Sequence, residues 1–272
     1  MKKAKKAITA IWEIIKRPYL LNKIVEDEHF KKKEFEKKFP QVGHFKQIPF
    51  EYFLKGESLT ISPYAFLGGS SLVTDQALLQ LLCRQNKVED YLEIGTWRGE
   101  SIANVAPYIT RGFTLNLSDE DLSNLGLDED YIKMHRYFST SLANVTHLFG
   151  HSQKFNFESL QTKFDLIFID GDHHTEAVRR DTERLFDLRK NENSIIVWHD
   201  AKSDPETPRY EVLLGIFAGI PPHLHKNIYL VENTLCAVYL TSEPNFEIAK
   251  PNKAPKHYFD VKMKQETCLR EP

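Results

Sequence analysis

Residues 164–186 read FDLIFIDGDHHTEAVRRDTERLF and combine a short apolar run, a polar turn and a run with helical periodicity. The apolar run, Phe164 to Ile169, is typical of a strand that is buried on both faces. After the turn, one helical face is formed by Val178, Thr182, Leu185 and Phe186, and the solvated side is expected to carry Arg179, Arg180, Asp181 and Glu183. The stretch therefore predicts a strand and a helix joined by a turn that contains Asp170 and His173.

Two other stretches have the same arrangement of an apolar strand followed by a polar turn. The first is YLEIGTWRGES, residues 91–101, in which Gly95 allows a sharp turn with close approach of a ligand, and Gly99 allows the next helix to pack tightly against the strand. The second is a strand from Ser194 to Trp198 that ends in His199 and Asp200. In an open parallel sheet ligands bind beyond the carboxyl ends of the strands, so these turns predict a shared site.

From Leu72 onward, strands and helices alternate in the manner of a parallel sheet with helices on both faces. Thr74 is expected to cap a helix from Asp75 to Arg84, and a polar region over residues 119–144 is expected to hold a helix around 129–139. The remaining expected strands cover residues 113–117 and 145–149, and IYLVENTLCAVYL, residues 228–240, is expected to form a hairpin with its turn at 232–234.

Glu93, Gly95 and Gly99 form a Glu-x-Gly-x-x-x-Gly pattern that resembles the first motif of class I S-adenosylmethionine-dependent methyltransferases. The pair IDGDHH, residues 169–174, and WHDA, residues 198–201, is more specific and is similar to the O-methyltransferase branch that includes sugar- and macrolide-modifying enzymes. Over residues 72–240 this resemblance implies a Rossmann-like, doubly wound, mostly parallel seven-stranded sheet with a C-terminal antiparallel hairpin. It also implies O-methylation of a hydroxyl on a saccharide or other small metabolite.

The resemblance implies a binding site for S-adenosyl-L-methionine along the first three strand ends. Its methionine and ribose portions would be surrounded by Glu93, Gly95, Thr96, Trp97, Arg98, Gly99 and Ser101, with Asp170 also in contact. Trp97 has the alternative role of plugging the top of the sheet. Asn116 stands where the family usually has a ribose-binding acid, unless Asp119 takes that role, and His151 and Ser152 would lie near the adenine.

Methyl transfer to a hydroxyl needs a base or a cation, and the resemblance supplies both. It implies His173 as the base, Asp170 as a catalytic acid group, and a divalent metal held by Asp170, His199 and Asp200. Relatives that bind Mg²⁺ have a carboxylate at the position of His199, and imidazole suits zinc, iron or nickel better. Either His199 is not a ligand or the metal differs. In competing structural roles, Asp172 and Asp200 cap the helices that follow them and His174 faces solvent.

The composition fits an ordinary globular protein of 272 residues with a formal charge of −2. Residues 1–46 carry thirteen Lys or Arg against six Asp or Glu, so the rest of the chain is acidic. Three distant cysteines, Cys83, Cys236 and Cys268, fit neither a disulfide framework nor a zinc cluster, which favours a cytoplasmic protein.

The first 21 residues form a basic segment with a helical stripe of Ala4, Ala7, Ile8, Ile11 and Ile15. The stripe is too short to span a bilayer, and no signal-peptide cleavage site follows. It fits peripheral contact with an anionic membrane, or packing on its own domain or on a second subunit of a homo-oligomer, which we favour. Residues 31–39 are expected to form a solvated helix, and no nucleic-acid partner is expected.

The expected division of the chain is a basic N-terminal helical extension over residues 1–71, a methyltransferase domain over 72–243 and a tail over 244–272. A nicotinamide-dependent oxidoreductase is disfavoured because the Gly-x-Gly-x-x-Gly spacing is missing. A catalytically inactive interaction module is a further alternative, which Asn116 and His151 favour. The acceptor would be recognised by the loops at 62–71 and 204–210, whose aromatic residues are Tyr64, Phe66 and Tyr210.

Overall fold

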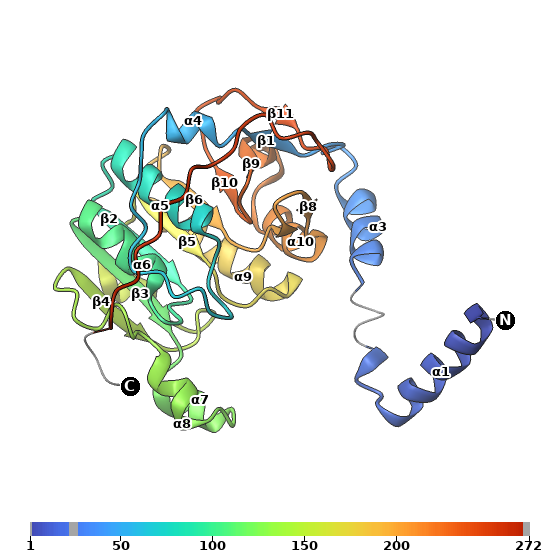
Figure 1. Cartoon of the computed structure of the whole chain (residues 1–272). Coiled ribbons are helices and arrows are strands. Elements are labelled where there is room, and N and C mark those ends of the chain that lie inside the picture. The colour runs from blue at the N-terminus through green and yellow to red at the C-terminus, as the bar shows by residue number, and fades with distance from the viewer. Residues whose placement is uncertain (1, 22–26, 269–272) are drawn as a thin grey trace.

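The computed structural model describes residues 2–21 and 27–268, in which a nine-stranded sheet is covered by helices on both faces (Figure 1). The strand order is β11-β1-β9-β10-β6-β5-β2-β3-β4. The strands are β1 (Lys46–Ile48), β2 (Asp90–Ile94), β3 (Arg111–Asn116), β4 (Val145–Phe149), β5 (Leu166–Ile169), β6 (Ile195–Trp198), β9 (Ile228–Val231), β10 (Ala237–Tyr239) and β11 (Glu247–Ile248). A separate two-stranded pair is formed by β7 (Lys202–Asp204) and β8 (Thr207–Pro208).

The seven strands from β9 to β4 in this order have the predicted mostly parallel arrangement. Strands β2 to β6 pair in parallel, and β10 is antiparallel to both of its neighbours, β6 and β9. The doubly wound class and the closing hairpin are therefore confirmed. The expected number of strands was too low, because β1 pairs with β9 and β11 pairs with β1. These two added strands are only three and two residues long, too short for a periodic pattern.

Helices from different parts of the chain cover the two faces of the sheet. The helices are α1 (Lys2–Lys16), α3 (Glu28–Lys38), α4 (Glu51–Leu54), α5 (Val73–Gln85), α6 (Glu100–Val105), α7 (Asp119–Asn124), α8 (Glu129–Met134), α9 (Thr175–Phe186) and α10 (Tyr210–Gly219). Short 3₁₀ turns lie at Ala106–Tyr108, Phe157–Leu160 and Pro222–Asn227. Side chains of α4, α5 and α6 belong to one apolar core, and those of α3, α9 and α10 belong to the other.

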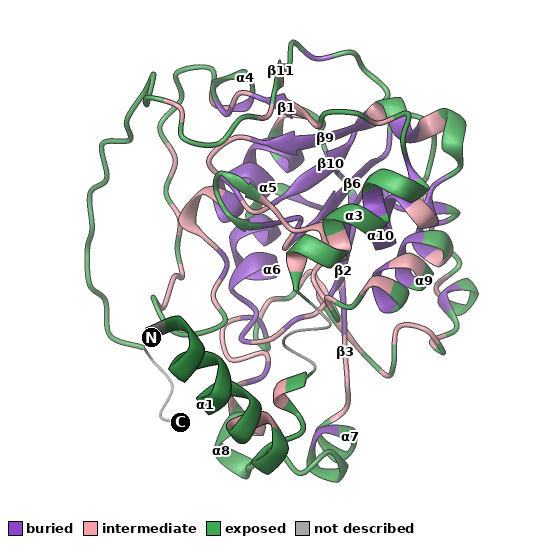
Figure 2. Ribbon diagram, turned by 90° about the vertical axis from the view of Figure 1, so that its right-hand side faces the viewer, coloured by how far each residue is buried: buried purple, intermediate pink, exposed green. Residues whose placement is uncertain are grey.

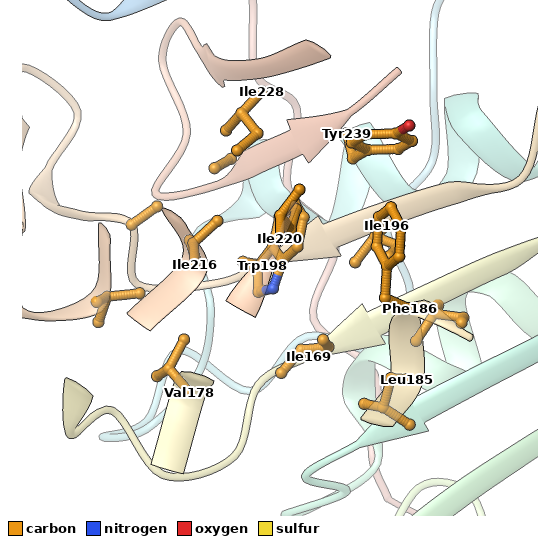
Figure 3. Close-up of a cluster of buried hydrophobic side chains, with 14 of the residues drawn as sticks. Ile169, Val178, Leu185, Phe186, Ile196, Trp198, Ile216, Ile220, Ile228 and Tyr239 are labelled. Carbon is orange, nitrogen blue, oxygen red and sulfur yellow. The ribbon is translucent and has the colours of Figure 1, made fainter. Parts of the chain in front are cut away.

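The central strands are buried on both faces, as the continuous apolar runs predict (Figure 2). Successive residues alternate between the two cores: Ile167 and Ile169 pack toward α9 and α10, whereas Phe168 packs toward α5. Figure 3 shows the α9 side, where Trp198 lies among aliphatic residues. The buried indole nitrogen of Trp198 donates to the Thr182 hydroxyl at 2.9 Å, so this polar group is satisfied.

Several local expectations need correction. Asp181 is buried rather than solvated, and α3 buries Phe35 against Phe217, so it is not a purely solvated helix. The chain after Asp200 forms β7 instead of a helix that Asp200 would cap. The helix expected from Asp75 begins at Val73, and Thr74 bonds to the Asn233 carbonyl at 2.6 Å instead of capping it. In each case a tertiary contact overrides the local pattern.

Helix α1 lies apart from the body in Figure 1, and its large apolar side chains are exposed. Its exposed apolar residues are Ile8, Ile11, Trp12 and Ile15. Within the described ranges, the side-chain hydrogen bonds and ion pairs of α1 stay inside residues 5–17, so packing on its own domain is not observed. No helix among the described residues is both long and apolar enough to cross a bilayer. The division of the chain into three parts stays a prediction.

Candidate active site at the carboxyl ends of the strands

The register of the central strands places the predicted turns at the same edge of the sheet. Ile94 pairs with Ile169, and Ile169 pairs with Trp198, so the next residues, Gly95, Asp170 and His199, lie side by side. Backbone hydrogen bonds of 2.8 Å from the Asp170 amide to Ile94 and of 3.0 Å from the His199 amide to Ile169 continue the ladder to this edge. The three chain segments therefore converge where β3 and β5 flank β2, which is the switch point of the strand order.

The two glycines of the turn after β2 are required by close contacts. Gly95 has φ +96°, and a Cβ atom there would collide with the main-chain carbonyl of Asp170. Gly99 has φ +80° and begins α6, where a Cβ atom would collide with the Ser139 hydroxyl. Gly99 therefore allows a loop to approach, instead of allowing the helix to pack on the strand as expected. The turn can follow this path only if neither position carries a side chain.

Glu93 lies behind the turn and is fully buried. The hydroxyls of Tyr91 and Thr114 donate to its two oxygens at 3.1 Å each, and Ser101 also donates to it. Burial raises the pKa of Glu93 to about 8. Thr96 joins the same group, since its hydroxyl lies 2.6 Å from that of Thr114. These predicted cofactor residues form one buried hydrogen-bonded unit beneath the turn.

Arg98 points toward the loop at residues 62–71. Its guanidinium donates to the Gly68 carbonyl at 3.0 Å, to the Ser70 hydroxyl at 2.6 Å and to Glu100 at 3.2 Å. Glu100 in turn accepts from the Ala65 amide at 2.6 Å. This buried ion pair holds the loop over the start of α6, so the described contacts of Arg98 are structural.

Trp97 covers the end of the turn with φ +43°. Its ring lies 4.6 Å from that of Tyr131 and 4.8 Å from that of His135, measured between centroids. Tyr131 belongs to α8 and His135 directly follows it. Neither was predicted as a partner of Trp97, because residues 119–144 read only as a polar region with a helix. The indole nitrogen is buried without a hydrogen-bond partner. These contacts agree with the plugging role, and the unpaired nitrogen leaves a donor for a ligand.

The predicted ribose and adenine residues have local partners. Asn116 Nδ2 lies 2.6 Å from His135 Nδ1, and Asp119 pairs with Arg136 at 2.7 Å. His151 is exposed and accepts from the Gln153 amide at 3.2 Å. The Ser152 carbonyl accepts from Arg184 at 2.5 Å. The pairing of Asp119 with Arg136 does not favour its replacing Asn116 at the ribose.

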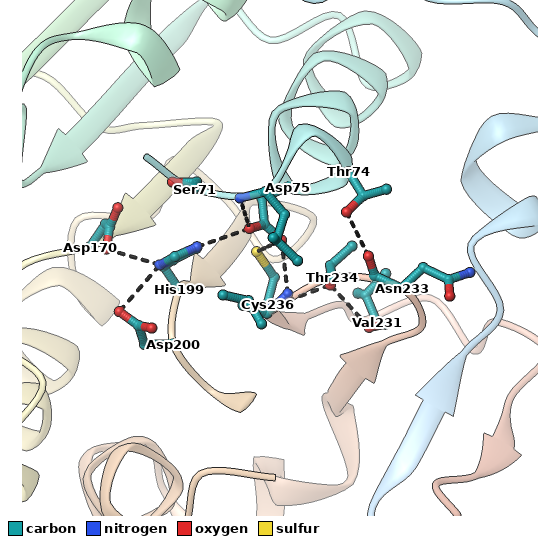
Figure 4. A network of polar contacts seen from close by, with 12 residues as sticks. Ser71, Thr74, Asp75, Asp170, His199, Asp200, Val231, Asn233, Thr234 and Cys236 are labelled. Carbon is teal, nitrogen blue, oxygen red and sulfur yellow. Dashed lines mark hydrogen bonds and ion pairs between the residues drawn. The ribbon is translucent and has the colours of Figure 1, made fainter. Parts of the chain in front are cut away.

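A cluster of carboxylates and imidazoles lies at the ends of β5 and β6 (Figure 4). His199 Nδ1 lies 3.2 Å from Asp170 Oδ1 and 3.3 Å from Asp200 Oδ2. His173 Nδ1 lies 3.1 Å from the same Asp200 oxygen, while Arg209 lies 3.5 Å from the other. The four residues predicted to supply base and metal ligands are thus brought together.

The charges in this cluster are strongly coupled. Burial alone would lower the pKa of His199, but Asp170, Asp200 and Asp75 raise it well above its ordinary value. Burial would raise the pKa of Asp200, yet His199, His173 and Arg209 hold it below its usual value. Asp170, His173 and Asp200 each offer a ligand atom within 4.8 Å of the others, so a cation fits this donor set. His199 Nδ1 is buried without an aligned hydrogen bond and faces the same place.

Asp75 is a member of this network that the sequence reasoning missed. It is fully buried at the start of α5, and its Oδ2 lies 3.0 Å from His199 Nε2 (Figure 4). Its oxygens also accept from the amides of Leu72 at 2.7 Å and Leu235 at 2.8 Å. From the sequence, Asp75 was expected only as the first residue of a helix, because its contact with His199 spans 124 residues.

The remaining residues near the cluster have structural partners or lie in solvent. Asp172 accepts from the His174 amide at 2.9 Å, but the N-cap of α9 is His174 and no side chain caps this helix, so Asp172 does not have the expected capping role. The His174 side chain is largely exposed, as expected. Tyr64 donates to the Ser71 carbonyl at 2.6 Å, and Tyr210 packs against Phe35 and Phe45. Of the three aromatic residues expected to contact an acceptor, Phe66 is largely exposed.

The match to known proteins agrees with this architecture. Residues 92–201 match the family model described as a methyltransferase domain. The matched segment runs from β2 past β6 and includes the glycine turn, Asp170, His173, His199 and Asp200. Over residues 92–201 this match agrees with the methyltransferase class recognised in the sequence. No curated protein matches the chain.

Solved structures with a similar fold include several methyltransferases. An O-methyltransferase from Bacillus cereus in complex with SAH is 18% identical, with 64% of this chain and 84% of that chain covered and a TM-score of 0.43. The O-methyltransferase TomG from Streptomyces achromogenes in complex with SAM is 15% identical, with 71% and 87% covered and a TM-score of 0.43. A putative caffeoyl-CoA O-methyltransferase from Staphylococcus aureus is 18% identical, with 69% and 95% covered and a TM-score of 0.44.

Proposed function

We propose that the chain is an S-adenosylmethionine-dependent O-methyltransferase that methylates a hydroxyl on a saccharide or another small metabolite. One observation carries this proposal: the glycine turn after β2 lies directly beside the cluster of Asp170, His173, His199 and Asp200. A methyl donor on the turn and a hydroxyl at the cluster would be neighbours, as the transfer requires.

The donor site would be formed by the turn at residues 95–99, with Trp97 against one end of the cofactor. The resemblance places the methionine and ribose portions along this turn, with Asn116 at the ribose, and the adenine near His151 and Ser152. Glu93, Thr96 and Ser101 support the turn from below through their buried hydrogen bonds. Backbone groups of the turn would supply most of the contacts, because the Arg98 side chain is engaged elsewhere.

His173 is proposed as the base because its geometry suits proton removal. Its Nδ1 lies 3.1 Å from Asp200, which accepts a hydrogen from that nitrogen and leaves Nε2 free to take the hydroxyl proton. The acceptor oxygen then forms a bond to the methyl carbon, the carbon–sulfur bond breaks, and S-adenosylhomocysteine leaves. The proton ends on His173 and later passes to water.

We also propose a divalent metal at the cluster, with Asp170, His199 and Asp200 as its ligands, because His199 Nδ1 lies 3.2 Å from Asp170 and 3.3 Å from Asp200. When bound, such an ion would stabilise the negative charge that develops on the acceptor oxygen. Asp170 has a second role here, since its main chain presses against Gly95 and links the metal position to the turn. Arg209 would help to hold Asp200 in place.

Calorimetry with S-adenosylmethionine and with S-adenosylhomocysteine tests the proposal. We expect both to bind at a 1:1 ratio, and methyl transfer from labelled donor to a panel of sugars and phenols to identify the acceptor class. Binding without transfer to any hydroxyl would remove the O-methylation claim. Failure of both ligands to bind would favour an inactive interaction module, and binding of NADH alone would favour an oxidoreductase.

For location, we propose the cytoplasm, which the few distant cysteines support; the three described cysteines are free thiols. For α1, we propose contact with an anionic membrane. Its apolar face includes Ile8, Ile11 and Trp12, and the opposite face is rich in lysine, which complements anionic headgroups. We expect the chain to sediment together with phosphatidylglycerol vesicles, and we expect this binding to weaken as salt is added. Dimerisation through α1 without vesicle binding would contradict this in favour of a second subunit.

A further inference from the structure

We propose that the cluster at β5 and β6 selects a divalent transition-metal ion over Mg²⁺, with His199 as a nitrogen ligand and Asp75 as the residue that positions it. The inference rests on the proposed function and deepens it. It concerns residues in which this chain departs from the carboxylate pattern of Mg²⁺-binding relatives.

The distances around His199 Nδ1 fit neighbouring ligands of one ion. Nδ1 lies 3.2 Å from Asp170 Oδ1 and 3.3 Å from Asp200 Oδ2. Ligand atoms that each lie about 2.1 Å from a metal are separated by about 3.0 to 3.4 Å in octahedral or tetrahedral coordination. The three atoms therefore need little movement to bind a shared ion.

The hydrogen bonding of the His199 ring leaves one nitrogen for this purpose. Nε2 lies 3.0 Å from Asp75 Oδ2, and because a carboxylate accepts, Nε2 carries the hydrogen. Nδ1 is buried and has no aligned hydrogen-bond partner. A histidine that binds a metal through one nitrogen usually donates from the other to a carboxylate, which fixes the ring.

Asp75 is itself held rigidly. It is fully buried, and the amides of Leu72 and Leu235 donate to it from two distant segments, the start of α5 and the β9–β10 turn. A tilt of the His199 ring would break its bond to Asp75 and leave a buried carboxylate under-satisfied. Asp75 therefore orients Nδ1 toward Asp170 and Asp200 without touching the ion.

The resulting donor set favours metals that accept nitrogen. Mg²⁺ prefers oxygen ligands in near-ideal octahedral geometry, whereas imidazole suits zinc, iron, nickel and related ions. Two carboxylates and one buried imidazole thus resemble a site for the latter group. His173 is less buried: its side chain is 43% exposed, compared with 8% for His199, and its Nδ1 pairs with Asp200 at 3.1 Å.

Cobalt(II) absorption provides a readout that does not depend on activity. We expect the metal-depleted full chain to bind Co²⁺ with visible d–d bands, Zn²⁺ to displace it at equimolar amounts, and Mg²⁺ to fail at about 100-fold excess. His199→Gln should weaken Co²⁺ binding at least about 10-fold, and Asp75→Asn should weaken it about 10- to 100-fold. His223→Gln, which removes an exposed imidazole from the turn at Pro222–Asn227, is the control and should leave Co²⁺ affinity within about 2-fold.

A double variant tests the same idea in the opposite direction. His199→Glu with Asp75→Asn restores a carboxylate ligand and removes the acid that would repel it. We expect this protein to lose its preference and to bind Mg²⁺ more tightly than the natural chain does.

Cadmium-113 NMR of the natural chain keeps the test decisive if a variant does not fold, since the chemical shift separates nitrogen-containing from all-oxygen coordination. The inference is overturned by an all-oxygen shift, by equal competition from Mg²⁺, or by absence of Co²⁺ binding. Calorimetry with S-adenosylmethionine in metal-free buffer distinguishes these outcomes from failure of the proposed function. Donor binding without metal selection would sink only this inference.

Discussion

Two carboxylate clusters lie at opposite ends of the same strands, and they differ in how their charge is balanced. Glu89, Asp90 and Asp165 gather at the amino ends of β2 and β5, and the cluster around Asp170 and Asp200 lies at the carboxyl ends. Each cluster has three side chains whose ligand atoms lie within 4.8 Å of one another. By spacing alone, both qualify as cation sites.

The amino-end cluster already contains its cation. Lys190 Nζ lies 3.1 Å from Glu89, 3.4 Å from Asp90 and 3.2 Å from Asp165, and Arg111 lies 2.6 Å from Asp90. At the carboxyl-end cluster the positive charge comes mainly from imidazoles, with Arg209 beside Asp200. An imidazole can release its proton and bind a metal instead. A group of neighbouring acids therefore indicates a functional site only where a lysine or arginine does not already occupy the space between them.

The largest expected difference between the two ends concerns catalysis. His173→Ala should lower kcat by about 10²- to 10⁴-fold while the affinity for S-adenosylmethionine stays within about 2-fold, because a base acts on the acceptor and not on the donor. Steady-state kinetics and calorimetry measure the two effects. Lys190→Met, at the other end of the strands, is the control and should leave kcat nearly unchanged. Equal losses of donor affinity and turnover in His173→Ala would contradict its role as base.

A medium effect is expected from Glu93, which lies on β2 between the clusters. Its folded-state pKa is about 8 against an ordinary 4.5, so the folded chain keeps a proton that the unfolded chain releases in this interval. Stability should therefore fall as pH rises, by about 2 to 3 kcal/mol between about pH 5.5 and pH 7.5. Glu93→Gln does not ionise and should flatten this slope in urea unfolding. An unchanged slope in the variant would show that other groups cause it.

The smallest effect is expected where the built-in cation is removed. Lys190→Met leaves three neighbouring acids without their ammonium group, so melting should occur at a slightly lower temperature in metal-free buffer. Added Ca²⁺ should restore part of the loss in the variant and have less effect at this cluster in the natural chain. Differential scanning fluorimetry measures both. If the melting temperature of the variant does not respond to Ca²⁺, the spacing of the three acids is not enough to bind a cation even when Lys190 is absent.

Much of the architecture was predictable because the central strands are buried and almost wholly apolar. The apolar runs that end at Ile94, Ile169 and Trp198 predict the parallel sheet. The polar residues that follow these runs predict where the site lies. The strand pairing then brought His173, His199 and Asp200 together as expected. Their individual roles, like those of the cofactor residues, stay predictions.

The missed features depend on contacts between distant residues. Asp75 meets His199 only after the sheet and α5 have packed, and Tyr131 meets Trp97 across a loop. Strands β1 and β11 are defined by their partners more than by their own residues. Asp181 was expected in solvent from its charge, yet it is buried beside the turn at Ser152. Local periodicity contains no information about such encounters.

The position of β1 has a consequence for how the protein is made. Residues 46–48 pair with residues 230–231 on one side and 247–248 on the other, so this early segment gains its neighbours only after about 200 further residues have been synthesised. Phe50 and Phe53, which follow β1 and belong to the buried core, would meanwhile be uncovered on the ribosome. The nascent chain is therefore expected to need a chaperone's protection at this segment until residues 228–248 have emerged.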